Sequence, residues 1–209
     1  MEDVLDLYAE PYDSQRPKVC FDETPQQLVA DKQAPLPTRP GDVARQDYEY
    51  QRQGTCNAFV FFEPQAGWRH VAVTDRRTKL DFAQQMKWLV DERYPAAKVI
   101  RVVLDNLNTH RLASLYEAFP PAEARRIAQR LEFHHTPKHG SWLNMAELEI
   151  NIFDRQCWDR RLGDRPTLER ETQALETQRN ADKATVHWRF TTQNARANLQ
   201  RLYPCLSVC

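Results

Sequence analysis

The sequence predicts an α/β fold in which a mixed five-stranded sheet is flanked by helices. The first half of the chain contains three runs rich in β-branched and aromatic residues, which is typical of strands. Two further apolar runs then alternate with helical patterns, as in units that build parallel sheets. The chain has 209 residues, of which 41% are hydrophobic and 28% charged, so it can bury a core without disulfide or metal support.

The first three predicted strands form an antiparallel meander. The first is Lys18–Glu23, which we expect to stop at the turn-forming pair 24–25. The proline-rich segment 34–47 is expected to be a loop within the domain. The second and third strands are Thr55–Glu63 and Trp68–Thr74, and the turn-like residues between them predict a hairpin.

A helix and a buried strand follow the meander. Thr78 and Asp81 have the spacing of a capping box, and the helix that they begin should end near Tyr94. The β-branched run Lys98–Leu104 then predicts a buried strand, reached by a parallel crossover.

The remaining elements complete the sheet. Residues 111–130 are predicted to be helical with a break around Pro120, followed by a short strand, Leu131–His135. Trp142 to about Trp158 lacks Gly and Pro and predicts one long helix packed between neighbours. This order of elements is that of the ribonuclease-H fold, although order alone fits other α/β folds.

Composition narrows the class of protein. No apolar run reaches the roughly 18 residues of a membrane span, and the acidic start does not resemble a signal peptide, so we expect a cytoplasmic protein with no membrane partner. The five cysteines lack metal-ligand spacing and are expected to be reduced. The net charge of zero argues mildly against a nucleic-acid binder, but residues 1–50 are acidic and the rest of the chain is basic.

Three carboxylates are placed where α/β sheets assemble their sites. Asp22 is expected to end the first strand, Asp105 follows the fourth, and Glu147 lies in the first turn of the long helix. Carboxylates gathered there repel one another unless divalent cations or raised pKa values relieve the repulsion. Oxygen ligands suit Mg²⁺ or Mn²⁺, and two such ions promote in-line displacement at phosphorus.

Other interpretations of these acids remain open. Any single acid is more often a solvated surface group, and Glu23 and Glu149 compete with their neighbours. Adjacent strand residues point to opposite faces, so Asp22 and Glu23 are not expected to face one site together. We favour Glu147 because it is expected to share a helix face with Asn144.

Several basic and aromatic residues are candidates for contact with DNA. The histidines at 134, 135 and 139 lack zinc-site spacing, and His139 beside Lys138 suits phosphate better, although a loop histidine without a role is equally consistent. Trp142 is placed to stack on a base, or else belongs to the core. The full set of candidate DNA-binding residues is Lys138, His139, Trp142, Arg155, Arg160 and Arg161.

The segments FDET, LDNLNTH and TPKHGSWLNMAELE resemble motifs of the mariner-like DDE transposase superfamily, in its bacterial insertion-sequence branch. The resemblance extends from about Val4 to Pro204 and implies that three acids bind two Mg²⁺ ions, with Mn²⁺ as a substitute. Water and then the freed 3′ end would attack DNA phosphodiesters. The implied catalytic and metal-binding residues are Asp22, Asp105 and Glu147, with Asn106, His110 and Asn144 in support.

The resemblance also suggests a domain organisation. Residues 1–165 would form the catalytic domain and 166–209 a helical C-terminal extension packed on it. The interval between the second and third acids is longer than in eukaryotic members, with a helical insertion around 117–130. The N-terminal helix-turn-helix region that reads transposon ends is expected to be absent, and the tail Cys205–Cys209 has no interpretable feature.

The leading hypothesis is therefore metal-dependent DNA cleavage and strand transfer. Its partners would be transposon ends and target DNA, and the chain would form a homodimer or pair with a full-length transposase, associated with the nucleoid when bound to DNA. The alternative is a non-catalytic transposase remnant that acts as a DNA-binding or oligomerisation module. A third hypothesis is a ribonuclease or junction-resolving nuclease on the same fold.

Overall fold

The computed structural model describes residues 1–33, 40–41 and 47–203. Its centre is one mixed sheet in the order β3-β2-β1-β4-β5, which confirms the predicted five-stranded α/β fold. The first three strands are antiparallel neighbours, whereas β4 and β5 run parallel to β1. The strands are β1 (Lys18–Asp31), β2 (Tyr50–Glu63), β3 (Trp68–Thr74), β4 (Ile100–Leu104) and β5 (Leu131–His135).

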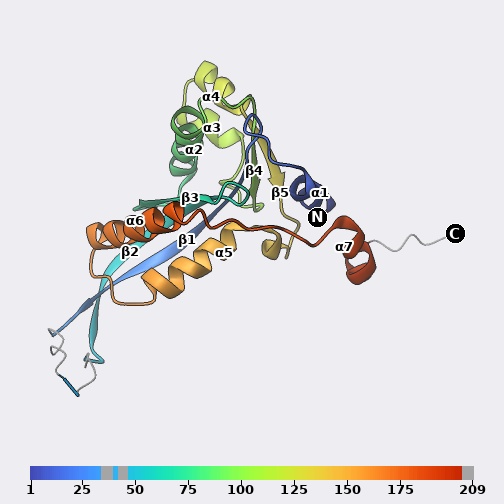
Figure 1. Cartoon of the computed structure of the whole chain (residues 1–209). Coiled ribbons are helices and arrows are strands. Elements are labelled where there is room, and N and C mark those ends of the chain that lie inside the picture. Colours follow the sequence, from blue (N-terminus) through green and yellow to red (C-terminus); the bar gives the residue numbers. More distant parts are fainter. Residues whose placement is uncertain (34–39, 42–46, 204–209) are drawn as a thin grey trace.

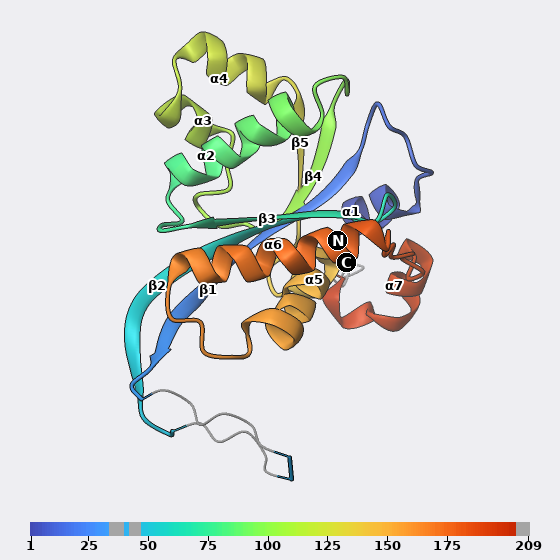
Figure 2. The same ribbon diagram turned by 60° about the vertical axis from the view of Figure 1, so that its left-hand side comes forward.

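Helices cover both faces of this sheet (Figures 1 and 2). One face packs against α2, α3 and α4, and the other against α5 and α6, while α1 and α7 lie together near one end of the sheet. The helices are α1 (Glu2–Ala9), α2 (Lys79–Trp88), α3 (Ala113–Ala118), α4 (Pro121–Ala128), α5 (Ala146–Phe153), α6 (Arg165–Ala181) and α7 (Thr192–Asn198). Within the described residues, no helix has the length and apolar character needed to cross a membrane.

Strand alternation decides which core each residue joins. Val19 and Phe21 of β1 point toward α2 and its neighbours, where they meet Phe82. Cys20 points the opposite way, into the cluster that includes residues of α1 and the turn before α5. A side chain's position along β1 therefore fixes the layer it reaches.

Most predicted elements are present at the predicted places. β3 and β5 have the predicted bounds, and Thr78 and Asp81 form the capping box of α2. The crossover through α2 joins the parallel strands β3 and β4, although β4 enters the sheet beside β1. The break at Pro120 separates α3 from α4. Most of the predicted 34–47 loop and all of the Cys205–Cys209 tail lie outside the described residues.

The predicted end of the first strand at Glu23 is wrong. β1 continues through Thr24 and Pro25 to Asp31 because β2 pairs with it over this whole length. Within β1, β4 pairs only with Lys18–Cys20, so the outer part of β1 has one neighbouring strand, and a proline without an N–H is tolerated there. The outer parts of β1 and β2 form an arm that extends beyond the rest of the domain (Figure 1).

The predicted single helix from Trp142 to Trp158 is also wrong in detail. A 3-10 turn, Ser141–Leu143, comes first, and α5 begins only at Ala146 and continues into a π-helical turn, Asp154–Trp158. Asn144 between them has an extended backbone, so it does not share a helix face with Glu147 as we expected.

Helix α6 runs beside the edge strand β3 and satisfies its outward-facing backbone groups. The Asn180 side chain accepts from the Arg69 N–H and donates to the Arg69 carbonyl, both at 2.8 Å. The Glu176 carboxylate accepts from the Val71 N–H at 2.8 Å, and Arg165 donates to the Val73 carbonyl at 3.1 Å. The division between residues 165 and 166 stays a prediction, but α6 is joined to the sheet at three successive outward-facing positions.

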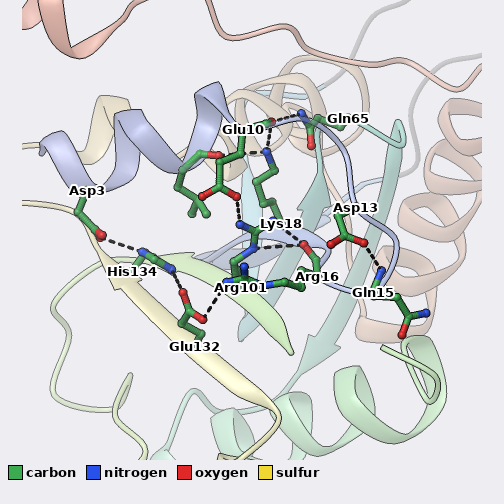
Figure 3. Close-up of polar contacts among 11 residues, drawn as sticks. Asp3, Glu10, Asp13, Gln15, Arg16, Lys18, Gln65, Arg101, Glu132 and His134 are labelled. Atoms are coloured by element: carbon green, nitrogen blue, oxygen red, sulfur yellow. Dashed lines mark hydrogen bonds and ion pairs between the residues drawn. The ribbon is translucent and has the colours of Figure 1, made fainter. Parts of the chain in front are cut away.

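Buried cations anchor the N-terminal segment at the other end of β1 and β4 (Figure 3). Lys18 Nζ donates to the carbonyls of Leu7 at 3.0 Å and Glu10 at 2.5 Å. Arg101 pairs with the Glu10 carboxylate and donates to the Arg16 carbonyl at 2.7 Å. These bonds hold the end of α1 against the sheet and are remote from the acids discussed below.

Candidate active site

Asp22 and Asp105 meet where β4 ends beside β1. The last paired residues of these strands are Cys20 and Val103, so Asp22 lies two residues beyond the pairing and Asp105 directly follows β4. The Asp22 carboxylate accepts hydrogen bonds from the Glu23 N–H at 2.9 Å and from Asn144 Nδ2 at 3.1 Å. Asn144 also donates to the Phe21 carbonyl at 2.8 Å. The segment before α5 is thereby fixed against β1.

Glu147 interacts electrostatically with Asp22 and Asp105. Burial raises the pKa of Asp22 to about 7, and the charges of Glu147 and Asp105 add to the rise, against a hydrogen bond from the Glu23 N–H. The pKa of Glu147 is raised by burial and by the charge of Asp105. Among the described residues, no Lys or Arg forms an ion pair with Asp22 or Glu147. The three acids therefore form a cluster with surplus negative charge.

His110 binds Asp105 from the buried side. Its Nδ1 lies 2.6 Å from Asp105 Oδ1, and its Nε2 lies 2.5 Å from Glu23 Oε2. Burial lowers the pKa of His110, but the hydrogen bonds to the two carboxylates outweigh it and raise the pKa to about 9. The pKa of Asp105 is lowered, chiefly by the His110 hydrogen bond. Near neutral pH His110 is therefore an imidazolium between two carboxylates.

The competing acids Glu23 and Glu149 have other partners. Glu149 is 1% exposed and pairs with Arg69 at 3.3 Å and Arg179 at 2.8 Å, so its charge is neutralised within the fold. Glu23 lies on the opposite face of β1 from Asp22, as alternation requires, yet it reaches Asp105 through His110. This link was not predicted from the sequence. The only signal for it was that Glu23 follows Phe21 on the same strand face, which makes it an acid at a core position.

The oxygen donors of Asp22, Asp105 and Glu147 fit a hard divalent cation. The surplus charge of the cluster and the raised pKa of Asp22 are the conditions that a bound cation relieves. Within the part of the chain that the structure describes, no three His, Cys, Asp or Glu side chains are gathered in an arrangement that already encloses a metal ion. The fit therefore rests on the chemistry of the donors and on their electrostatic coupling.

Loops after β4 and β5 form a shallow hollow beside Asp105. Asn106 Nδ2 donates to the Thr136 carbonyl and so joins the two loops. Lys138 and His139 line the hollow, and His139 has a left-handed backbone with φ of 63°. Two of the candidate DNA-binding residues thus lie next to one of the candidate catalytic acids.

The other candidate DNA-binding residues lie before and after α5 in the chain. Trp142 is 44% exposed and packs against Trp188 and Phe190, with ring centroids 6.1 and 5.8 Å away. Arg155 is exposed on the π-helical turn after α5. Arg160 pairs with Glu171 at 2.5 Å, and Arg161 pairs with Asp31 at 2.6 Å. Both of these arginines are thus engaged within the protein, Arg161 at the outer end of β1.

Comparisons with known proteins give one family. The family described as "DDE superfamily endonuclease" matches residues 17–169, whereas no curated protein matches the chain. Among solved structures, the Mos1 mariner paired-end complex with Mn is similar in fold, with a TM-score of 0.55 and 13% sequence identity over 87% of this chain. A pre-cleavage Mos1 transpososome covers 88% of the chain at 13% identity with a TM-score of 0.37. The chain spans 55% of the Mos1 chain in the first of these structures and 61% of that in the second.

Proposed function

The chain belongs to the DDE superfamily of endonucleases, and from that premise we propose that it is a transposase catalytic domain that cleaves DNA strands and transfers the freed ends. The observation that carries the proposal is the cluster of Asp22, Asp105 and Glu147. Among the described residues, Asp22 and Glu147 form no ion pair with a cation, and the His110 that pairs with Asp105 is shared with Glu23. A structural cluster of acids would be neutralised internally, as Glu149 is.

The three acids would hold two Mg²⁺ ions, for which Mn²⁺ could substitute. Such ions supply a nucleophilic oxygen and charge stabilisation for in-line displacement at phosphorus. The protein's own contribution is to place the acids. Asn144 orients Asp22 by donating to its carboxylate, and His110 fixes Asp105.

We assign DNA contact first to the residues nearest the acids. Lys138 and His139 line the hollow beside Asp105 and would neutralise a phosphate there. The half-exposed face of Trp142 would stack on a base, while its other contacts hold it in place. Arg155 is exposed and free to reach the backbone of DNA. Arg160 and Arg161 would first have to leave Glu171 and Asp31.

The structural relative suggests the partners. It is a paired-end complex with Mn, and this description applies to the Mos1 protein alone. For this chain we propose binding of transposon-end and target DNA by a homodimer or by a pair with a full-length transposase. The alternative function is a non-catalytic remnant that binds DNA or its partner.

The proposal is tested by Mn²⁺-dependent nicking of supercoiled plasmid DNA. The wild type should nick, and Asp105→Asn and Glu147→Gln should each reduce the rate by at least about 1,000-fold, as loss of an essential catalytic group does. Glu117→Gln, a surface acid paired with Lys79, is the matched control and should leave the rate unchanged.

Two outcomes would redirect the proposal. A folded wild type that binds Mn²⁺ in calorimetry but nicks no DNA would favour the remnant. Preference for RNA–DNA hybrids or branched junctions over duplex transposon ends would favour a ribonuclease or a junction-resolving nuclease.

A further inference from the structure

A chain of three side chains leads from the core to the candidate metal site. Glu23 Oε2 lies 2.5 Å from His110 Nε2, and His110 Nδ1 lies 2.6 Å from Asp105 Oδ1. The side chains of Glu23 and His110 are only 3% and 1% exposed, whereas that of Asp105 is 42% exposed. The buried end of the chain is therefore in the core, and its last carboxylate is open to the site.

The imidazole of His110 is held in one orientation. Its ring packs edge-on against Phe21, with centroids 5.2 Å apart, and lies 5.0 Å from the ring of Phe82. Each ring nitrogen faces one carboxylate, so rotating the ring would break both hydrogen bonds inside an apolar pocket. The position of His110 thus depends on Glu23 as much as on Asp105.

The two carboxylate oxygens of Asp105 differ in their hydrogen bonds. Oδ1 accepts from His110 and also from the Leu107 N–H at 3.0 Å. Among the described residues, Oδ2 receives no hydrogen bond, so it is the oxygen left for another ligand. Carboxylates that bind metals are commonly oriented by such bonds to their other oxygen.

Glu23 has no local use that would explain its burial. Its Oε1 has no hydrogen-bond partner among the described residues, and the arginine with which this oxygen pairs, Arg77, is half-exposed and 4.0 Å away. A buried carboxylate with one unsatisfied oxygen costs stability, and a hydrophobic residue beside Phe21 would cost less. This cost is consistent with a role in function.

We propose that Glu23 is a positioning residue, which acts through His110 to fix the Asp105 carboxylate with Oδ2 directed to a divalent cation. The inference rests on the proposed metal site and adds a fourth acid to it, on the face of β1 opposite Asp22. Glu23 itself does not contact the cation or the DNA.

Calorimetric titration of Mn²⁺ into the purified chain tests this assignment. Glu23→Gln should bind Mn²⁺ about 10- to 100-fold more weakly than the wild type, as loss of a residue that orients a metal ligand does. Glu63→Gln is the matched control because Glu63 is 2% exposed on the neighbouring strand and bonds Tyr94. It should leave Mn²⁺ affinity unchanged. If Glu23→Gln fails to fold, Glu23→Asp, which keeps the charge but shortens the reach to His110, replaces it and should show the same loss.

The ¹⁵N resonances of the His110 ring supply a readout that a purely structural Glu23 would not move. In the wild type, saturation with Mg²⁺ should shift the Nδ1 resonance, because the Asp105 charge becomes shared. In Glu23→Gln the same shift should require about 10- to 100-fold more Mg²⁺.

The failures are distinguishable. Equal Mn²⁺ affinity in the wild type, Glu63→Gln and a folded Glu23 variant would overturn the positioning role while leaving the nuclease proposal intact. Affinity that depends on Glu23 in a protein that nicks no DNA would support the positioning role and count against the nuclease. The absence of Mn²⁺ binding in the wild type would overturn both.

Discussion

Helix α5 carries two glutamates, two residues apart, in opposite electrostatic surroundings. Glu149 is buried between Arg69 and Arg179, which come from β3 and α6. Glu147 interacts electrostatically with Asp22 and Asp105 and has no ion-pair partner among the described residues. A carboxylate neutralised inside the protein holds elements together, whereas one left with other acids can respond to a cation from solution.

The internal cluster around Glu149 should show the largest effect on stability. Glu149→Gln leaves Arg69, which is fully buried, without its counter-charge and should lower the free energy of unfolding by about 3–5 kcal/mol. Glu147→Gln, the same change on the same helix, should cost less than about 1 kcal/mol without metal. Urea unfolding in EDTA measures both losses of stability. Equal losses would contradict the proposed difference between the two glutamates.

Added cation should make the loss of Glu147 more costly than it is without metal. Mn²⁺ at about 100 times its dissociation constant should raise the free energy of unfolding of the wild type by about 2.7 kcal/mol. Glu147→Gln should lose most of this gain because it removes one of the three ligating acids. Thermal unfolding with and without Mn²⁺ is the measurement. If the variant gained as much stability from Mn²⁺ as the wild type, Glu147 would not be a metal ligand.

The ionisation of Asp22 should make the stability of the protein depend on pH. Its folded pKa of about 7 lies above the unfolded value of about 4, so ionising it lowers stability as pH rises from about 4 to 7. Without metal, Asp22→Asn should therefore be about 2 kcal/mol more stable than the wild type at pH 8, and this advantage should shrink toward pH 4. Urea unfolding in EDTA at both pH values tests the sign. A constant difference between the two proteins would show that the carboxyl is not desolvated.

A smaller effect than at Asp22 is expected for Asn144, a neutral side chain that partly relieves the Asp22 charge. Asn144→Ala should lower the free energy of unfolding by roughly 1 kcal/mol, because the bonds to Asp22 and the Phe21 carbonyl are lost. The exposed Asn151, which donates to the Glu147 carbonyl, is the control and should cost less when changed to Ala. Chemical unfolding of the two variants side by side decides whether the bonds from Asn144 to β1 stabilise the fold.

The sequence predicted the sheet well because strand composition and turns are local signals. β3 and β5 have the predicted bounds, and the capping box of α2 was visible as a spacing of three residues. The length of β1 was not predictable, because its extension past Pro25 depends on pairing with a strand that begins 25 residues later. Long-range pairing of this kind leaves no mark in a local window.

The candidate site divides in the same way. Asp105 was visible because it follows an apolar strand directly, and Asp22 lies beside it although the reason given for it, a strand end, was wrong. The preference for Glu147 over Glu149 depended on a helix face that Asn144 does not occupy. Glu149 is excluded as a candidate metal ligand by its ion pairs with Arg69 and Arg179. These arginines lie 80 and 30 residues away in sequence, so only the tertiary structure could reveal the ion pairs.

The cover that α6 places over β3 bears on how the protein can be shortened. An uncovered edge strand offers a template on which other chains add strands and aggregate. Cutting the chain at residue 165 would remove Glu176 and Asn180, and with them the bonds to the backbone of Arg69 and Val71. A fragment that kept every candidate catalytic acid would then be prone to insolubility, so soluble expression requires α6 as well.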